Sequence, residues 1–201
     1  MIKSLYFDNT AYQYAYELER LIRNFSLPHR LEFYTDKTPH GTDYAYFCAD
    51  NGKLSVTVSD NDTVYKESSD VCELSDYENE LCRLLCRCME RHGHAPLPWG
   101  ILTGVRPVKL LRRLAEESNE EQAVKKFEKD FFVSNEKIAL SRETEYNERK
   151  ILELSKPESF SLYVGIPFCP SRCSYCSFVM ASIERAEKLI EPYTKLLCEE
   201  I

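Results

Sequence analysis

Three cysteines lie within eight residues near the end of this 201-residue chain, at Cys169, Cys173 and Cys176. Their C-x3-C-x2-C spacing also matches one face of a helix, so a buried helical stripe is one interpretation. However, prolines at 167 and 170 flank the first cysteine, and the segment PSRCSYCS is polar. These features favour an exposed loop that follows the apolar run SLYVGI.

The spacing also limits which metal these thiols would hold. A zinc site with four ligands needs one more Cys or His nearby, and none follows before Cys198. Three thiolates on one loop suit an iron–sulfur cluster, whose irons accept sulfur ligands. A four-iron cluster held this way keeps one iron open to a small molecule. The metal ligands predicted from the sequence are therefore Cys169, Cys173 and Cys176.

The charge and hydropathy of the chain exclude several classes of protein. With 26 basic and 33 acidic residues the net charge is −7, so no global basic field favours nucleic acid. No apolar run approaches the ~20 residues of a membrane span, and the N-terminus lacks a signal peptide's apolar core. We therefore expect a cytoplasmic protein with no membrane span and no nucleic-acid partner. In that reducing compartment, clustered cysteines indicate metal binding rather than disulfides.

Residues 1–74 are predicted to form an α+β subdomain with a small mixed or antiparallel sheet. Apolar periodicity predicts a helix over 11–25, capped by Thr10. Runs of aromatic and β-branched residues predict strands over 2–7, 30–35, 43–49, 53–59 and 62–67. Asp50-Asn51-Gly52 is typical of a hairpin turn between the third and fourth strands.

Residues 75–155 are predicted to form a helical subdomain. Helices are expected over 75–93, 106–117, 119–132 and 134–154, with Gly93 ending the first. Asn119 and Ser134 are the predicted caps of the last two. Gly104 and Pro107 are expected at a turn and at the first helical position, respectively.

The stretch 155–160 breaks the helical pattern and marks a boundary. After it, residues 161–166 are almost wholly apolar and predict a buried parallel strand. A helix over 192–201 is expected to begin with Pro192 at its first position. Residues 160–201 would then supply a first strand, a cluster loop and a first helix.

Two other groups of residues invite a functional interpretation. Cys82, Cys86 and Cys88 with His92 and His94 suggest zinc, but buried or half-buried thiols on an ordinary helix explain the pattern better. Cysteines 48, 72 and 198 are isolated and are expected to be packing residues.

The basic stretch RPVKLLRR, residues 106–113, suggests a phosphate or nucleic-acid contact. Because acidic residues follow it, a solvated helix face is favoured. Its first residue, Arg106, could instead pair with a carboxylate across the contact between domains. A DNA- or RNA-binding module is disfavoured by the acidic balance of the chain.

The string LYVGIPFCPSRCSYCSF resembles radical S-adenosylmethionine enzymes, and within them the coproporphyrinogen III dehydrogenase group (the oxygen-independent oxidases). The segment WGILTGVRPVKLLRRL, residues 99–114, is similar to one found upstream of the cluster in the HemZ branch. The resemblance covers about Ser75 to Ile201. It implies an α+β N-terminal domain followed by the start of a radical S-adenosylmethionine (β/α) barrel, in which active sites lie at the C-terminal ends of the strands.

The resemblance also implies the chemistry. Cys169, Cys173 and Cys176 would hold a [4Fe–4S] cluster, and Tyr163 and Tyr175 match positions that contact S-adenosylmethionine. A radical generated from this cofactor would take hydrogen from a propionate of coproporphyrinogen III, and loss of CO2 would leave a vinyl group. A flavodoxin or ferredoxin would supply electrons. No catalytic side chain of the protein is identified.

Two positions depart from the best-characterised enzymes of the group. Gly165 stands in place of a His, and Phe178 stands in place of a fourth Cys. In the second departure the chain resembles both the HemZ branch and the related haem-chaperone branch. A HemW-like haem-delivery protein without decarboxylase activity is therefore the alternative. Conversion of coproporphyrinogen III, set against tight haem binding, separates the two.

Length is the last constraint. A full (β/α)8 barrel takes ~250 residues, and only one strand and one helix follow the boundary at 155–160. We therefore expect a truncated barrel, with the 201-residue chain inactive by itself and Ser161–Ile201 loosely held.

Overall fold

A computed structural model describes residues 2–25, 30–61, 63–71 and 73–201. The chain separates into two compact units, Met1–Leu154 and Ser155–Ile201, called the first and second units below. In the first unit one hydrophobic core runs from the sheet into the helices and is continuous across residue 74, where a subdomain boundary was predicted.

The first unit contains a five-stranded mixed sheet. The strands are β1 (Ser4–Phe7), β2 (Glu32–Thr35), β3 (Tyr44–Asp50), β4 (Lys53–Asp60) and β5 (Thr63–Asp70). Their order is β2-β1-β3-β4-β5. The β1 strand is parallel to both neighbours, whereas β3, β4 and β5 form an antiparallel meander. The predicted strand over 62–67 extends to Asp70; its first predicted position, 62, lies outside the described residues.

The helices of the first unit follow the predicted order. They are the 3-10 turn η1 (Ala11–Tyr14), α1 (Ala15–Phe25), η2 (Leu74–Asp76), α2 (Tyr77–Arg91), α3 (Pro107–Glu117), α4 (Glu120–Lys129) and α5 (Asn135–Leu152). Among the described helices of the chain, none combines the length and apolarity that crossing a bilayer requires.

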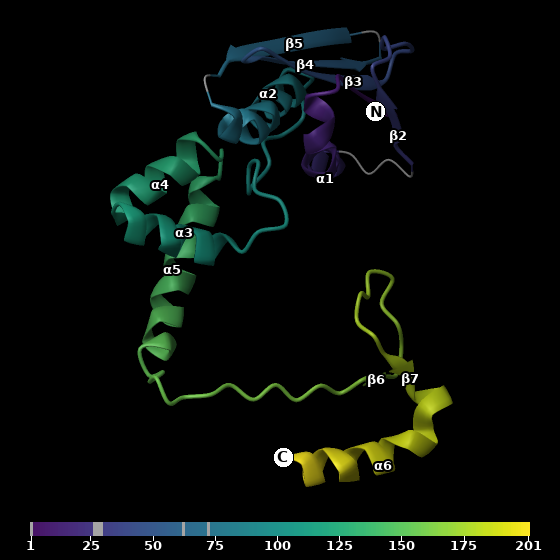
Figure 1. Cartoon of the computed structure of the whole chain (residues 1–201), viewed down its shortest axis with the longest axis vertical. Coiled ribbons are helices and arrows are strands. Elements are labelled where there is room, and N and C mark those ends of the chain that lie inside the picture. The colour runs from purple at the N-terminus through teal and green to yellow at the C-terminus, as the bar shows by residue number, and fades with distance from the viewer. Residues whose placement is uncertain (1, 26–29, 62, 72) are drawn as a thin grey trace. The chain divides into compact units, whose positions relative to one another are not determined.

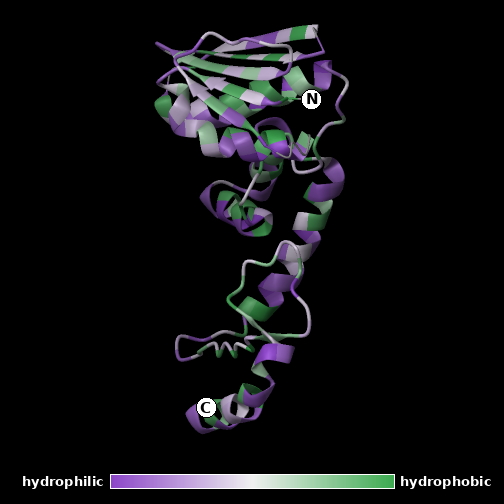
Figure 2. Cartoon of the chain, turned by 90° about the vertical axis from the view of Figure 1, so that its right-hand side faces the viewer, coloured by the Kyte–Doolittle hydropathy of each residue, from purple (hydrophilic) through white to green (hydrophobic). Residues whose placement is uncertain are grey.

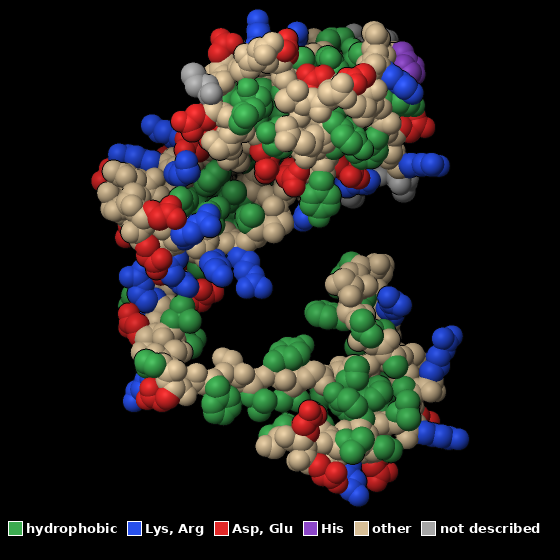
Figure 3. Space-filling model, viewed as in Figure 1, with side chains coloured by type: hydrophobic (Ala, Val, Ile, Leu, Met, Phe, Trp, Pro, Cys, Tyr) green, Lys and Arg blue, Asp and Glu red, His purple; other side chains and the backbone are tan. Residues whose placement is uncertain are grey.

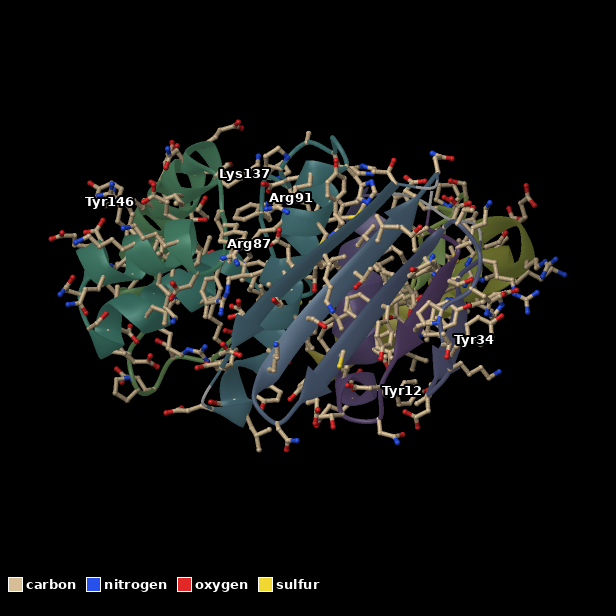
Figure 4. The ribbon with its side chains drawn as sticks, turned by 90° about the horizontal axis from the view of Figure 1, so that it is seen from above. Tyr12, Tyr34, Arg87, Arg91, Lys137 and Tyr146 are labelled. Carbon is tan, nitrogen blue, oxygen red and sulfur yellow. The ribbon has the colours of Figure 1, made fainter. Side chains whose placement is uncertain are left out.

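One face of the sheet is covered by α1 and α2 (Figure 1). Hydrophobic and hydrophilic residues alternate along the strands (Figure 2), because successive side chains in a strand point to opposite faces. Leu5, Phe7 and Phe47 point to the helical side and are fully buried. Seen from above the sheet, the strands lie in front of α1 and α2, and Tyr34 lies at the edge of the sheet (Figure 4). Its ring stacks on Tyr6 at 4.8 Å.

The turn between β3 and β4 has the predicted chemistry. Asn51 and Gly52 both have positive φ, of 47° and 83°. Two successive residues in this region form the turn whose twist matches that of a hairpin. The prediction from Asp50-Asn51-Gly52 is therefore confirmed.

The predicted cap at Thr10 is wrong, because its side chain makes no capping hydrogen bond. Asp8 performs this role instead, accepting a hydrogen bond from the Ala11 amide at 2.6 Å. The other carboxylate oxygen of Asp8 accepts from the Ala49 amide, also at 2.6 Å. One carboxylate thus ties the start of the first helical segment to β3.

The caps of the later helices are confirmed. Asn119 accepts from the Gln122 amide at 2.9 Å, and Ser134 accepts from the Lys137 amide at 3.4 Å. The α4 helix ends at Lys129, three residues earlier than predicted. The reason is Phe132, whose positive φ of 58° takes the backbone out of the helical region.

The connector over 94–100 is anchored to the turn that follows α4. Gly100 has a φ of 55°, and a β-carbon there would lie 1.9 Å from the carbonyl oxygen of Phe131. The amide of Ile101 donates to that same oxygen at 2.9 Å. Only glycine permits this approach of two backbones.

The second unit departs from the prediction of a buried strand over 161–166. The structure forms no strand there, and Leu162 and Ile166 are 63% and 64% exposed. The described strands of this unit are β6 (Phe168–Cys169) and β7 (Ala181–Ser182), which pair in parallel. An apolar run becomes a buried strand only beside a partner strand, and β6 and β7 pair only with each other. Figure 3 shows the hydrophobic side chains that this leaves at the surface of the unit.

The helix of the second unit, α6 (Ile183–Glu200), begins nine residues before the predicted start. Pro192 lies inside it rather than at its first position. The residues before Pro192 are good helix formers, so the helix continues through the proline at the loss of one backbone hydrogen bond. Proline in a helix interior bends it, and α6 changes direction along its length in Figure 1.

We predict that Asp8→Ala lowers the free energy of unfolding by about 2–3 kcal/mol, because two backbone amides lose their acceptor. Thr10→Ala, two residues away, should change it by less than about 0.5 kcal/mol. Denaturant unfolding monitored by circular dichroism measures both. Equal effects of the two substitutions would show that Asp8 is not the cap.

We also predict that the amides of residues 163–166 exchange with solvent almost as fast as in an unfolded chain. None of them donates a hydrogen bond within the described residues, whereas the amides of β4 lie between two strands. Hydrogen exchange with mass spectrometry compares the two segments in one sample. Protection at 163–166 as strong as in β4 would overturn the prediction.

Candidate metal centre

The three predicted cluster ligands lie on one loop of the second unit. Cys169 is the second residue of β6, and Cys173 and Cys176 lie in the connection to β7. The Cys176 amide donates to the Cys173 carbonyl at 3.0 Å, which forms a turn between the last two cysteines. The loop is closed at its base by the Ala181 amide, which donates to the carbonyl of Pro167 at 2.8 Å.

The thiols of this loop are accessible. Cys173 is exposed, and Cys169 and Cys176 are half-buried. The two tyrosines assigned by resemblance to S-adenosylmethionine contact, Tyr163 and Tyr175, are each 87% exposed. Ligands for a cofactor that enters from solvent need this kind of exposure.

Donor chemistry and geometry must both fit a metal. Three thiols on one loop are the right donors for iron and sulfide. Among the described residues, however, no three Cys, His, Asp or Glu side chains are arranged around a common metal position. The residues therefore fit a cluster by type, and holding one requires the loop to draw its thiols together.

Sequence reasoning did not single out Tyr193 on α6. Its hydroxyl donates to the Gly165 carbonyl at 2.5 Å. Its ring meets Phe168 edge-on at 5.3 Å. Tyr193 thus holds the segment before Cys169 against α6. No local signal indicates this role, because Gly165 is 28 residues away in the sequence.

The second group of cysteines lies in an environment of the opposite kind. Cys82, Cys86 and Cys88 on α2 are all buried. Burial raises the pKa of Cys86 to about 12 and that of Cys88 to about 11, and it raises the pKa of Cys82 further. A buried thiol keeps its proton because the thiolate would lose its hydration.

The nearby histidines do not complete a zinc site with these thiols. His92 donates from Nε2 to the Val58 carbonyl at 3.1 Å, and its ring meets Tyr65 at 4.6 Å. His94 packs edge-on against Phe25 at 6.0 Å. The helix is therefore a packing element, as the sequence favoured.

Of the isolated cysteines, Cys48 is half-buried, but Cys198 is exposed on α6 and is not a packing residue. The expectation for Cys198 is wrong because α6 buries only Ala186 and offers no packed surroundings at position 198. Cys72 lies outside the described residues.

We predict that a maleimide at pH 7 modifies Cys173 within minutes and leaves Cys82, Cys86 and Cys88 intact until the chain is unfolded.

The raised pKa values also make stability depend on pH: the folded state keeps protons that the unfolded thiols release above about pH 8.5, so stability falls as pH rises from there. Cys82→Ala with Cys86→Ala should flatten this fall. Mass spectrometry of labelled peptides, and unfolding measured between about pH 8 and 11, test the two statements. Rapid labelling of Cys86 in the folded chain would contradict the burial.

No protein-family model matches the chain, and no solved structure matches it. The chain is 34% identical over 110 residues to the oxygen-independent coproporphyrinogen-III oxidase-like protein HemZ of Bacillus subtilis. The alignment covers 53% of this chain and 22% of the Bacillus protein, so the chain spans less than a quarter of that curated relative. Over about half its length, the chain is thus similar to a HemZ-like protein.

Proposed function

We propose that this chain is part of a radical S-adenosylmethionine oxidoreductase of the coproporphyrinogen-III oxidase-like group, acting in haem biosynthesis in the cytoplasm. The observation that carries the proposal is the set of three accessible thiols at C-x3-C-x2-C on the loop from β6 to β7. The similarity to the HemZ-like protein of Bacillus subtilis supports it.

Cys169, Cys173 and Cys176 would hold a [4Fe–4S] cluster. When bound, a cluster of this kind supplies one-electron chemistry to S-adenosylmethionine. Tyr163 and Tyr175 lie on either side of the first cysteine in sequence, and their exposed rings offer flat surfaces against which the cofactor would pack. In this proposal residues 160–201 are the start of the (β/α) barrel, and residues 1–74 and 75–155 precede it as α+β and helical subdomains.

The reaction proposed for the whole protein is the oxidative decarboxylation of coproporphyrinogen III to protoporphyrinogen IX. Each of two propionate side chains would lose CO2, a hydrogen atom and one electron to become a vinyl group, with S-adenosylmethionine as the overall oxidant. A flavodoxin or ferredoxin would be the electron donor that starts the reaction. Because the chain spans 22% of its relative, this activity belongs to the proposal for the whole protein.

The alternative is a haem-delivery protein that keeps the cluster and does not decarboxylate. The observation that favours it is Phe178, which replaces a cysteine two residues after the cluster motif and is 76% exposed. Haem titration and product analysis with coproporphyrinogen III separate the two functions. Tight haem binding without vinyl product would select the alternative.

We predict that anaerobic reconstitution with iron and sulfide yields a brown, oxygen-labile protein with about four irons per chain. Serine at Cys169, Cys173 or Cys176 should each abolish the colour and the iron. Two controls should retain both: Cys198→Ser, an exposed thiol of the same unit, and Cys82→Ala with Cys86→Ala on α2. Iron analysis and the visible spectrum give the readout. Full iron content in Cys169→Ser would disprove the ligand assignment.

A further inference from the structure

A shallow pocket lies on the first unit, over the first half of α3, and none of the cysteines of the candidate metal centre lines it. It has a volume of about 280 Å³ and is lined by Val105, Arg106, Lys109, Leu110 and Arg113. Lys109, Leu110 and Arg113 lie on one face of α3, and Arg106 is the extended residue directly before its first turn. Lys and Arg side chains gather beside hydrophobic ones over the start of α3 in Figure 3.

The structure divides the basic stretch over 106–113 into two sets of charges. Arg112 points toward α5 and pairs with Glu145 at 3.2 Å and Glu148 at 2.7 Å. Within the described part of the first unit, Arg106 and Lys109 take part in no ion pair. Arg112 is thus a structural contact, whereas the pocket cations are available to a ligand.

The remaining pocket cation, Arg113, is only weakly engaged. It lies 3.7 Å from Glu117, and both side chains are more than half exposed. An exposed pair of this kind contributes little and exchanges readily with another anion. The three cations that line the pocket therefore repel one another with little compensation from the protein.

A fourth cation reaches this segment from α1. A β-carbon built at Gly104 would lie 2.7 Å from Nη1 of Arg20, so the guanidinium packs directly against the turn before α3. Arg20 donates to the Tyr16 hydroxyl at 2.9 Å and, among the described residues, to no carboxylate. Sequence reasoning missed Arg20, because it lies 84 residues before Gly104.

The apolar part of the pocket restricts what would bind there. Val105 is 48% exposed and Leu110 is half-buried, so two aliphatic side chains lie among the cations. The start of α3 also presents the positive end of the helix dipole. Cations beside an apolar surface suit an anion with a hydrophobic body rather than a small hydrated ion.

We propose that this pocket binds the carboxylates of an apolar polycarboxylate of the tetrapyrrole class, with Arg106 and Lys109 as the principal contacts. The anionic chemistry follows from the pocket, and the choice of a tetrapyrrole rests on the proposed function. At about 280 Å³ the pocket accommodates one propionate-bearing edge of such a molecule, which leaves its remaining groups outside.

A solvated helix face, the interpretation favoured from the sequence, explains the pocket less well. The chain has 33 acidic residues against 26 basic ones, so carboxylates to pair with are abundant. Arg112 on the same helix has two of them. The absence of such partners within the described residues at Arg106, Lys109 and Arg20 concentrates positive charge on an otherwise acidic protein.

The test measures binding of coproporphyrin III to the 201-residue chain without iron, by porphyrin fluorescence. Arg106→Gln with Lys109→Gln should weaken binding at least about tenfold, because two charge-assisted contacts are lost. The matched control, Lys53→Gln with Lys66→Gln on β4 and β5, removes the same charge elsewhere in the first unit and should bind as the wild type does. The uncharged tetramethyl ester should bind weakly to all three proteins. Circular dichroism should show all three equally folded, since the four substituted side chains are exposed.

Each other outcome overturns the proposal. Unchanged affinity in the Arg106/Lys109 variant would show that these residues do not contact the ligand. Equal weakening of binding in the control would show that the loss of net positive charge, and not of specific contacts, causes the effect. Tight binding of the ester would exclude carboxylate recognition, and no binding by the wild type would exclude the site. The proposed function is tested separately, because iron content of the same variant reports on the cysteine loop and not on this pocket.

Discussion

The packing of α2 between the sheet and the other helices is the contact on which the first unit depends. Leu81, Leu84 and Leu85 are fully buried in its core. On one side the Cys88 thiol donates to the Val56 carbonyl of β4 at 3.5 Å. On the other side Arg83, held by Glu80 at 2.6 Å, donates to the Asp130 carbonyl after α4 at 3.1 Å. Because one helix contacts both layers, the sheet and the helices share a core.

The structural features that could be predicted from the sequence are those formed by residues close together along the chain. The caps at Asn119 and Ser134 bond to amides three residues away, and the turn at Asn51-Gly52 is encoded by the two residues themselves. Asp8 could not be identified, because one of its two partners, Ala49, lies 41 residues away. Thr10 lies next to the first helical residue, so the local pattern favours it as the cap.

The errors in the second unit have a similar origin. Apolar composition over 161–166 indicates that these residues prefer burial, but a strand also needs a partner at hydrogen-bonding distance. For Pro192, the preference of proline for the start of a helix was outweighed by the helix formers on both sides. In the candidate site, spacing alone identified the loop of three cysteines. It could not indicate Tyr193, which fixes the segment before the loop through a carbonyl 28 residues away.

The two sets of three cysteines show how environment decides the use of one side chain. On α2 the thiols are enclosed by apolar neighbours, and the raised pKa values keep them protonated. At the end of β6 and in the loop that follows it, one thiol is exposed and two are half-buried. A thiol must lose its proton to bind iron, so only the accessible set is suited to that task.

Gly100 has a consequence for the evolution of the segment that follows it. Any side chain there would collide with the Phe131 carbonyl, so the position accepts no change unless the turn after α4 is rebuilt at the same time. A substitution in the connector at this position therefore requires a compensating change in the turn after α4. The exposed side chains at 105, 106, 109 and 113 can diversify without moving the backbone that presents them, because the contact at Gly100 is made by backbone atoms alone. Selection for a new ligand at this surface would act on the exposed positions and leave the glycine unchanged.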